Sequence, residues 1–437
     1  MSRFRPLCLA VAALAALACV AGLTLGRAGL WQPSALAAAV ALALGIGAIP
    51  SLRGYQFTAW IIAAVIGGMI YPSAFLHWGN FDLRNKALIL VVVQLVMFGM
   101  GTQMSLHDFR GVARNPRGVL VGIVCHFSIM PLVGYGLTRL FSFPPEIAAG
   151  VILIGSCSSG LASNVMAYLA RSNLVLSVTV TAITTLVAPV LTPFLMQRLA
   201  GTLVEVKFLN LMVEIIKIVL VPIGAAMLHD QLKHSARRQQ MIVHGLSILA
   251  AGYVVFLLSS ASPLRYAAGV ETGSEVSSNV AVVIELSGFV AGAILAGNLY
   301  HQLTRLLPKL DSFMPALSMA GIVYFTTVTT AAGQDNLLRV GALLFVASVL
   351  HNGAGYFFGY WLSRVAGLDK NSARSVAFEV GLQNGGMASG LAGSMGKLGT
   401  VGLAPAIFSP WMNISGSILA NYWRRRPVDG TESSPKP

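Results

Sequence analysis

Two segments of this 437-residue sequence place glycines and polar side chains inside otherwise apolar runs. One reads Gly155-Ser-Cys-Ser-Ser-Gly-Leu-Ala-Ser-Asn164, and the other reads Glu379-Val-Gly-Leu-Gln-Asn-Gly-Gly-Met387. Glycine weakens a helix, and Asn and Ser side chains offer the backbone competing hydrogen bonds. Backbone groups freed in this way are not tolerated in lipid, so each segment predicts a broken helix that lines a cavity enclosed by protein.

Glu379 is the strongest single candidate for a binding residue in these segments. A charged side chain at membrane depth costs roughly 2.5–3.5 kcal/mol on insertion scales unless it is paired. Arg374, five residues earlier, is an alternative partner, but the neighbouring Gln383 and Asn384 are polar too and favour a binding site. A hard cation held by oxygen atoms is the natural partner for such a carboxylate.

A following apolar run carries Ser177 and Thr181, which lie four residues apart and therefore share a helix face. Their hydroxyl groups are suitable neutral ligands for the same cation. The alternative is that each hydroxyl bonds back to a carbonyl of its own helix, which is common in membranes.

The composition indicates that membrane spans position these residues. Hydrophobic residues make up 56% of the chain and charged residues 10%, whereas a soluble domain has roughly 45–50% and 25%. So few charges exclude a soluble enzyme, a disordered chain and a nucleic-acid binder, and leave a protein of the lipid bilayer. The four cysteines all fall in apolar stretches without disulfide or metal spacing, which favours buried thiols.

About fourteen stretches are long enough to cross a bilayer as helices. They lie near 8–26, 31–52, 56–75, 87–105, 118–138, 146–170, 174–197, 208–228, 243–262, 279–300, 311–332, 340–363, 375–396 and 400–423. If the amino terminus lies inside and every stretch crosses, 19 of the 29 Lys and Arg fall in inside loops and nine in outside loops. Because basic residues favour cytoplasmic loops, we expect a multi-pass cell-membrane protein with a cytoplasmic C-terminus.

The two interrupted stretches occupy matching positions. Counted from residue 55, each is the fourth of five spans, provided that 243–262 and 279–300 form an insertion. Five is odd, so the second half enters the membrane with opposite polarity, and inverted repeats with broken helices are typical of transporter binding sites. Close packing of small residues is the alternative, but packing does not require Glu379, Gln383 and Asn384 together.

This count divides the chain into five parts. Whether residues 1–26 are cleaved, and what the insertion does, stay open. They are 1–54, extra N-terminal hydrophobic helices or a signal anchor; 55–228, the first five-helix repeat and the start of the second; 229–310, an inserted two-helix segment; 311–423, the rest of the second repeat; and 424–437, a disordered basic tail. Within these parts, Lys217 is expected to pair with Glu214, while Glu285 has no expected partner.

Several segments in the right order resemble the bile acid:sodium symporter family. They are MFGMGTQMSLHDF (97–109), HFSIMPL (126–132), ASNVMAYLA (162–170), LSVTVTAITTLVAPVLTP (176–193), LHNGAGYFFGYWL (350–362), EVGLQNGGMA (379–388) and PAIFSPWMNISGSILA (405–420). The resemblance implies an all-α integral membrane fold, with a ten-helix core of two inverted five-helix repeats and crossed broken helices. The N-terminal and inserted helices are additions to that pattern.

The resemblance also implies site residues. A first sodium site would use Ser163, Asn164, Ser177, Thr181 and Glu379. A second would use the side chains of Glu379 and Gln383 with the carbonyls of Val380 and Leu382, and His126 stands where the family has a glutamine. Imidazole is a poor sodium ligand and titrates near neutral pH, which predicts weakened or mixed sodium and proton coupling. On the cargo side, Asn384 and Asn413 match cavity positions, and Leu161 replaces a threonine.

The resulting hypothesis is a sodium-coupled symporter that imports a small or amphipathic organic anion by alternating access, with one or two Na+. The alternative is a proton-coupled or exporting organic-anion or metalloid carrier of the same superfamily, in which Cys157 would handle the cargo. A membrane enzyme is disfavoured because His126 and His351 lie on different spans without neighbouring acids. The particular anion and the oligomeric state stay open.

Overall fold

The computed structural model describes residues 4–259 and 276–428, so residues 1–3 and 429–437 of the expected termini lie outside it. Apart from a short hairpin, the described chain is built from helices. The longer ones are α1 (Phe4–Thr24), α2 (Ala28–Gly45), α3 (Gln56–Ile70), α5 (Lys86–Gly101), α7 (Pro116–Leu140), α8 (Pro145–Ser156), α9 (Ala162–Leu169), α10 (Leu174–Ala200), α11 (Phe208–Ile215), α12 (Val221–Lys233), α13 (Arg237–Leu258), α15 (Val276–Leu306), α16 (Leu310–Ala332), α17 (Gln334–Val365), α18 (Lys370–Gly381), α19 (Gly385–Ser394) and α20 (Leu403–Arg424).

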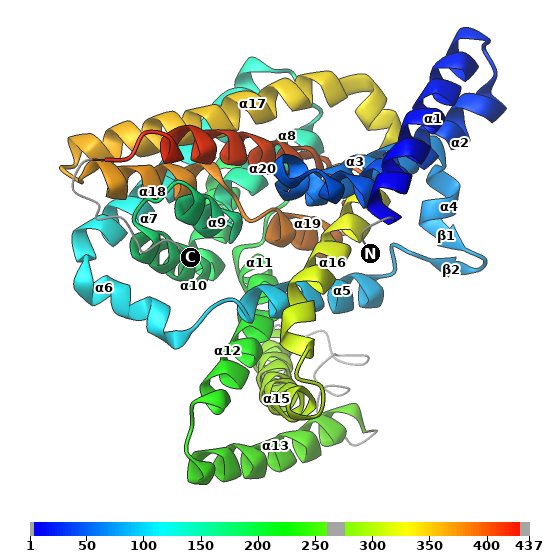
Figure 1. The fold of residues 1–437 in the computed structure, drawn as a ribbon. Coiled ribbons are helices and arrows are strands. Elements are labelled where there is room, and N and C mark those ends of the chain that lie inside the picture. The colour runs from blue at the N-terminus through cyan, green and yellow to red at the C-terminus, as the bar shows by residue number, and fades with distance from the viewer. Residues whose placement is uncertain (1–3, 260–275, 429–437) are drawn as a thin grey trace.

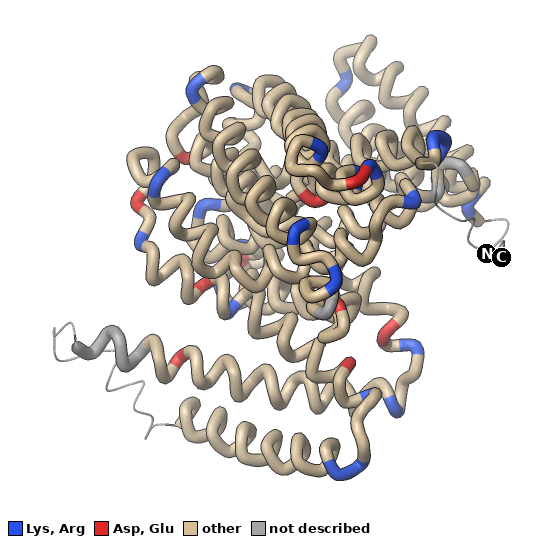
Figure 2. Tube along the Cα trace, turned by 90° about the vertical axis from the view of Figure 1, so that its left-hand side faces the viewer, with Lys and Arg blue, Asp and Glu red and all other residues tan. Residues whose placement is uncertain are grey.

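Shorter elements connect them. These are η1 (Ile46–Ala48), η2 (Pro50–Tyr55), α4 (Pro72–Leu76), the strands β1 (His77–Trp78) and β2 (Phe81–Asp82), η3 (Leu106–Arg110), α6 (Gly111–Arg114) and the π-helical turn η4 (Ile216–Leu220). Among the described residues, nine helices are long and apolar enough to cross a membrane, or ten if the bent pair Lys86–Gly101 and Leu106–Arg114 is one span. Figure 2 shows charged residues gathered near helix ends, with long uncharged stretches between them.

The helices form two packed groups, and in the second group three helices of the first half of the chain and three of the second half pack in the same way. In the first group, which we call the panel, α3 packs on α16 and α5 packs on α12. In the second, which we call the core, α7 packs on α8 and α10, and α17 packs correspondingly on α18 and α20. With each broken pair counted as one span, panel and core together make a ten-span helical membrane fold, as expected from the sequence.

The two broken helices cross at the centre of the core. After α8 the chain is extended at Cys157, and after α18 it is extended at Leu382. The two breaks pair as an antiparallel bridge between Ser159 and Gln383, with 2.8 Å from Gly160 N to Leu382 O. Gly160 permits this approach, because a Cβ there would lie 2.7 Å from the Gln383 carbonyl oxygen.

Two helical hairpins lie outside the repeats. Helix α1 packs along α2, which leans on α3, and Figure 1 shows this pair at the upper right of the molecule. The inserted helices α13 and α15 pack on each other, and α15 packs on α12 of the panel (Figure 1, bottom). The insertion is therefore attached to the panel, whereas the broken helices belong to the core.

Candidate functional site

The carboxylate of Glu379 lies in a cradle of hydroxyl groups. Ser163 Oγ donates to Glu379 Oε1 over 2.6 Å, and Thr181 Oγ1 donates to Oε2 over 2.7 Å. Ser177 Oγ donates to Oε1 as well. The Glu379 side chain has no exposure, and among the described residues no Lys, Arg or His forms an ion pair with it. Among the described residues, the carboxyl group of Glu379 thus contacts neutral hydroxyl donors and no basic side chain.

Asn164 contacts two of these hydroxyl groups. Its Oδ1 lies 2.9 Å from Ser177 Oγ and 3.1 Å from Thr181 Oγ1, whose single protons are donated to Glu379. Helices α9, α10 and α18 therefore bring together the five residues named for a first cation site: Ser163, Asn164, Ser177, Thr181 and Glu379. Three kinds of oxygen atom, from hydroxyl, amide and carboxylate groups, converge here, and all three are suitable for a hard cation.

The residues of the expected second site are engaged with one another. His126 Nδ1 lies 2.9 Å from the Glu379 carbonyl oxygen, and its Nε2 lies 2.8 Å from the Cys157 carbonyl oxygen. Gln383 Nε2 donates to the Val380 carbonyl over 2.6 Å, while Gln383 Oε1 is buried and has no hydrogen-bond partner in the part of the chain that the structure describes. The Leu382 carbonyl accepts from Gly160 N. The imidazole ring thus bridges the ends of α8 and α18.

The expected cargo residues lie on three elements around the crossing. Leu161 is half-buried at the start of α9, and Asn384 caps α19 by accepting from Met387 N over 3.0 Å. Asn413 lies on α20, which packs on α9, and its amide nitrogen donates to Ser409 O of its own helix. Leu161 and Asn384 therefore flank the crossing directly, whereas Asn413 lies one helix away.

Two further residues support the crossing and were not named from the sequence. Asn352 on α17 donates to the Gly381 carbonyl over 2.7 Å, which satisfies an oxygen freed where α18 ends. Ser159 Oγ lies 3.4 Å from both Ser163 Oγ and the Leu382 carbonyl. Polar side chains in apolar spans are the signal that could have identified both, because unmatched polar groups are costly there.

A second buried charge lies in the panel. Lys217, in the π-helical turn η4, pairs with Glu214 at 2.5 Å and with Glu285 of the insertion at 2.9 Å. Its backbone carbonyl accepts from Gln94 of α5 over 3.3 Å. The expected Lys217–Glu214 pair is present, and Glu285 has found its partner in the same lysine.

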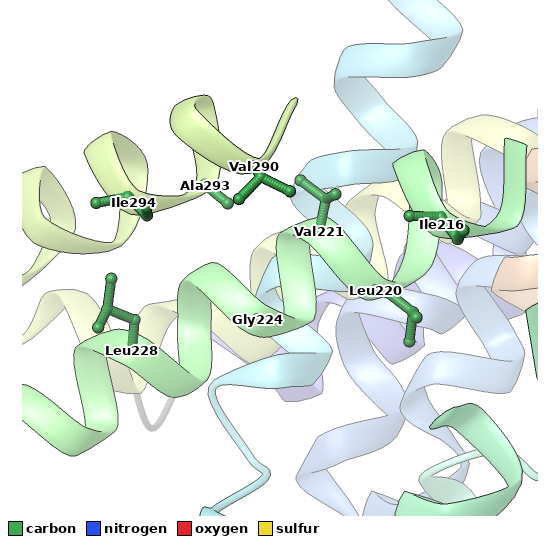
Figure 3. Close-up of a pocket in the computed structure, with 8 residues that line it drawn as sticks. All are labelled: Ile216, Leu220, Val221, Gly224, Leu228, Val290, Ala293 and Ile294. Atoms are coloured by element: carbon green, nitrogen blue, oxygen red, sulfur yellow. The ribbon is translucent and has the colours of Figure 1, made fainter. Parts of the chain in front are cut away.

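The apolar crevice between α12 and α15 is not a candidate for this chemistry. Figure 3 shows its eight lining residues, all without polar side-chain atoms, around a space of about 380 Å3. Such a surface suits acyl chains or a helix. Within the described chain, no group of three His, Cys, Asp or Glu side chains could hold a metal ion.

The fold and the buried carboxylate define a membrane transporter, and comparison with known proteins gives its family. Residues 90–264 match the model of the Sodium Bile acid symporter family. The "Uncharacterized sodium-dependent transporter YocS" of Bacillus subtilis is 32% identical over 379 residues, covering 86% of this chain and 94% of that protein. The chain belongs to the Sodium Bile acid symporter family, whose members are transporters and not enzymes.

More distant relatives fit this assignment. The "Probable sodium/metabolite cotransporter BASS1, chloroplastic" of Arabidopsis thaliana is 27% identical, covering 84% of this chain and 73% of that protein. The human "Ileal sodium/bile acid cotransporter" is 25% identical, covering 68% of this chain and 67% of that protein. The sodium proton antiporter MjNhaP1 from Methanocaldococcus jannaschii shares the fold, with a TM-score of 0.54, 12% identity and coverage of 90% and 98%.

Proposed function

We propose that this chain is a sodium-coupled symporter that imports a small or amphipathic organic anion. The observation that carries the proposal is the Glu379 carboxylate, which is fully buried and held by three hydroxyl donors without a basic partner among the described residues. A buried charge of this kind favours a cation with oxygen ligands. The names of the relatives, which specify sodium and bile acid, support sodium as the ion and an organic anion as the cargo.

The transport cycle that we propose is alternating access, with the core moving against the panel. Sodium at Glu379 would tie α9, α10 and α18 together. The amino ends of α9 and α19 meet at the crossing, and their dipoles favour the acid group of an anion once the sodium charge is in place. Binding of the cation would thus prepare the binding of the anion.

We propose further that one sodium ion is coupled to each anion. His126 stands where the family has a glutamine, and both of its ring nitrogens are already engaged, with the carbonyls of Glu379 and Cys157. The carbonyls of Val380 and Leu382 already accept hydrogen bonds from Gln383 and Gly160, and the remaining Gln383 Oε1 does not make a cation site by itself.

Ion counting in proteoliposomes tests this stoichiometry. One sodium with a monovalent anion moves no net charge, so a membrane potential should leave uptake unchanged. We expect His126→Gln to restore a second site and to make uptake electrogenic, with about 2.3 kcal/mol per 100 mV for the one net charge. Two sodium ions per anion in the unaltered protein would contradict the proposal.

The function itself is tested by a thermal-shift screen of organic anions in sodium and in choline buffers. A ligand stabilises the folded protein according to its concentration relative to its dissociation constant. We expect cholate or a smaller carboxylate to raise the melting temperature only when sodium is present, and a sodium gradient to drive uptake of the same anion. Equal stabilisation in both buffers, with uptake independent of sodium, would refute the proposal.

The alternative carrier, proton-coupled or exporting and with a metalloid as possible cargo, depends on Cys157. This residue has no exposure and lies in the apolar core cluster, while its carbonyl contacts His126. These contacts support a packing role for the thiol. Replacing Cys157 with serine should leave uptake intact, and loss of uptake in that variant would favour the alternative.

We also propose that the C-terminus is cytoplasmic, from the 19 to nine distribution of basic residues. A protease site appended after Pro437 should be cut in inside-out vesicles and protected in intact cells. The reverse pattern would invert the assigned orientation.

A further inference from the structure

A polar cavity lies at the boundary between panel and core, away from the Glu379 cradle. Its volume is about 590 Å3. The panel contributes Arg84 and Lys86 at the start of α5, and the core contributes Glu146, Asn336 and Lys397. We call it the seam cavity. Because α19 packs on α5 and α16 packs on α20, any movement of the core against the panel changes its shape.

The charges of the seam cavity are unequal. Three basic side chains and one carboxylate line it. Arg84 is held by Asp82, with 3.0 Å from its Nε to Oδ1 and 3.0 Å from its Nη2 to Oδ2, and Lys397 is paired with Glu146. Among the described residues Lys86 is in no ion pair and is exposed. The cavity therefore has an excess of positive charge centred on Lys86.

The neighbouring cavity provides a contrast at the same end of the molecule. It encloses about 410 Å3 on the other side of Met395, and its charged residues are Glu205, Lys207 and Glu214. Lys207 is paired with Glu205 at 3.3 Å, and Glu214 with Lys217. Positive excess is thus a property of the seam cavity and not of this whole face.

The wall of the seam cavity also links to the broken helix. Lys397 lies in the turn that joins α19 to α20, and Asn336 Nδ2 donates to the Gly399 carbonyl of that turn over 3.0 Å. The Lys397–Glu146 pair ties the turn to the first residues of α8. An acid group bound at Lys397 would replace Glu146 and release this tie between the two broken helices.

We propose that the seam cavity is an anion-binding vestibule, in which the carboxylate or sulfonate of the cargo is attracted by Lys86 and displaces Glu146 from Lys397. The vestibule deepens the proposed symport, because it rests on an anionic cargo and places a first binding step ahead of the crossing. The same charges repel organic cations, which makes the cavity a filter for the sign of the cargo.

Charged thiol reagents test the vestibule without requiring transport. In full-length protein in detergent, a cysteine at Asn336 is modified with an anionic sulfonatoethyl or a cationic trimethylammonioethyl methanethiosulfonate. One unit charge about 5 Å away in water changes the local concentration of a monovalent ion about fourfold, upward for the anion and downward for the cation. The ratio of anionic to cationic modification rates should therefore be roughly 15-fold higher than the same ratio measured with free mercaptoethanol. The unaltered protein supplies the blank, since Cys8, Cys125 and Cys157 are buried and Cys19 is half-buried.

Matched variants make this test specific. Adding Lys86→Glu to Asn336→Cys should abolish the preference for the anionic reagent, whereas adding Arg237→Glu, an exposed position on the inserted helix α13, should keep it. Asn210→Cys in the neighbouring cavity should show no anionic preference. Thr400→Cys reports from the turn that carries Lys397 should the loss of the Asn336 hydrogen bond disturb folding. Equal rates for both reagents at Asn336 and Thr400 would overturn the proposal.

Protection by a ligand tests the displacement of Glu146. Cholate below its micellar concentration should slow modification of Asn336→Cys, and Glu146→Gln should lower the half-protecting concentration by freeing Lys397. Lys86→Glu should raise it about tenfold. If neither cholate nor benzoate protects the cysteine, the vestibule does not bind the cargo and the proposal fails. Failure of sodium-driven uptake with protection intact would instead count against the symport.

Discussion

Two buried ionisable residues of this protein are solvated in opposite ways. Glu379 in the core is surrounded by hydroxyl groups and has no basic partner among the described residues, whereas Lys217 in the panel pairs with two carboxylates. Both lie in helices of the membrane-spanning part of the fold. A charge neutralised within the protein serves the structure, while a charge left to neutral donors is available to an ion from outside.

The difference also follows the division into panel and core. Lys217, in the turn η4 that leads into the panel helix α12, is paired with Glu285 of the inserted α15, so its ion pairs connect elements that we expect to stay together. Glu379 lies where α9, α10 and α18 meet, next to the crossing of the two breaks. Ligand-dependent stabilisation is therefore expected in the core, and constitutive stabilisation in the panel.

The largest effect is expected for Glu379→Gln. Removing one partner of a buried ion pair costs about 3–5 kcal/mol, which corresponds to a loss of more than 100-fold in sodium affinity. In sodium-free buffer the same variant should be as stable as the unaltered protein or more so, because it buries no uncompensated charge. Melting temperatures measured in sodium and in choline buffer give the sodium affinity and the sodium-free stability of the variant. If Glu379→Gln keeps the sodium-dependent shift, the carboxylate of Glu379 does not bind the ion.

The second effect is a loss of stability in the panel. Lys217→Met leaves Glu214 and Glu285 without their cation and should lower the free energy of unfolding by about 2–4 kcal/mol in every buffer. The sodium-dependent shift should stay as large as in the unaltered protein. The triple variant Lys217→Met, Glu214→Gln, Glu285→Gln serves as the control and should recover most of the loss. A sodium shift that disappears with Lys217 would place this lysine in the ion pathway.

The residues around Glu379 could be predicted from the sequence because they are polar residues within apolar membrane spans. A carboxylate and hydroxyl groups are misplaced in apolar spans, and the spacing of Ser177 and Thr181 assigns them to one helix face. The matching positions of the two interrupted stretches similarly indicated the repeats. The structure brings these residues together, although their role as sodium ligands stays a proposal.

Contacts between distant segments were not accessible in the same way. Lys217 and Glu285 are 68 positions apart, and the breaks meet through backbone groups of Gly160 and Leu382, which periodicity does not report. His126 was assessed as a poor sodium ligand, but its bridging of two backbone carbonyls depends on the rotation of α7 against both breaks. Packing of whole helices decides such contacts, and local residue pattern does not encode it.

A third and smaller effect is expected from a single neutral donor. Thr181→Val removes the hydroxyl that contacts Glu379 Oε2 but keeps the shape of the side chain, and a hydrogen bond to a charged group is worth about 1.5–3 kcal/mol. We expect sodium affinity to fall about tenfold, measured by titration of the thermal shift. Thr179→Val is the matched control, since Thr179 is buried on the same helix and bonds instead to Asp108 O and Val175 O. Equal losses in both variants would show that the hydroxyls act through α10 and not through the carboxylate.

The smallest effect is expected for Glu214→Gln. This variant tests whether Lys217 needs both of its carboxylate partners, Glu214 and Glu285, for the stability of the panel. Lys217 keeps Glu285 in this variant, and the lost pair with Glu214 spans only three residues, so the loss of stability should be about 0–1 kcal/mol. Glu285→Gln should cost more, because it removes the pair that joins α15 to the turn η4 and leaves Lys217 only with Glu214 three residues earlier. Melting temperatures of the two variants, measured side by side, decide the order. If Glu214→Gln proves the more damaging, the π-helical turn depends on its local pair, and the insertion is attached by apolar packing alone.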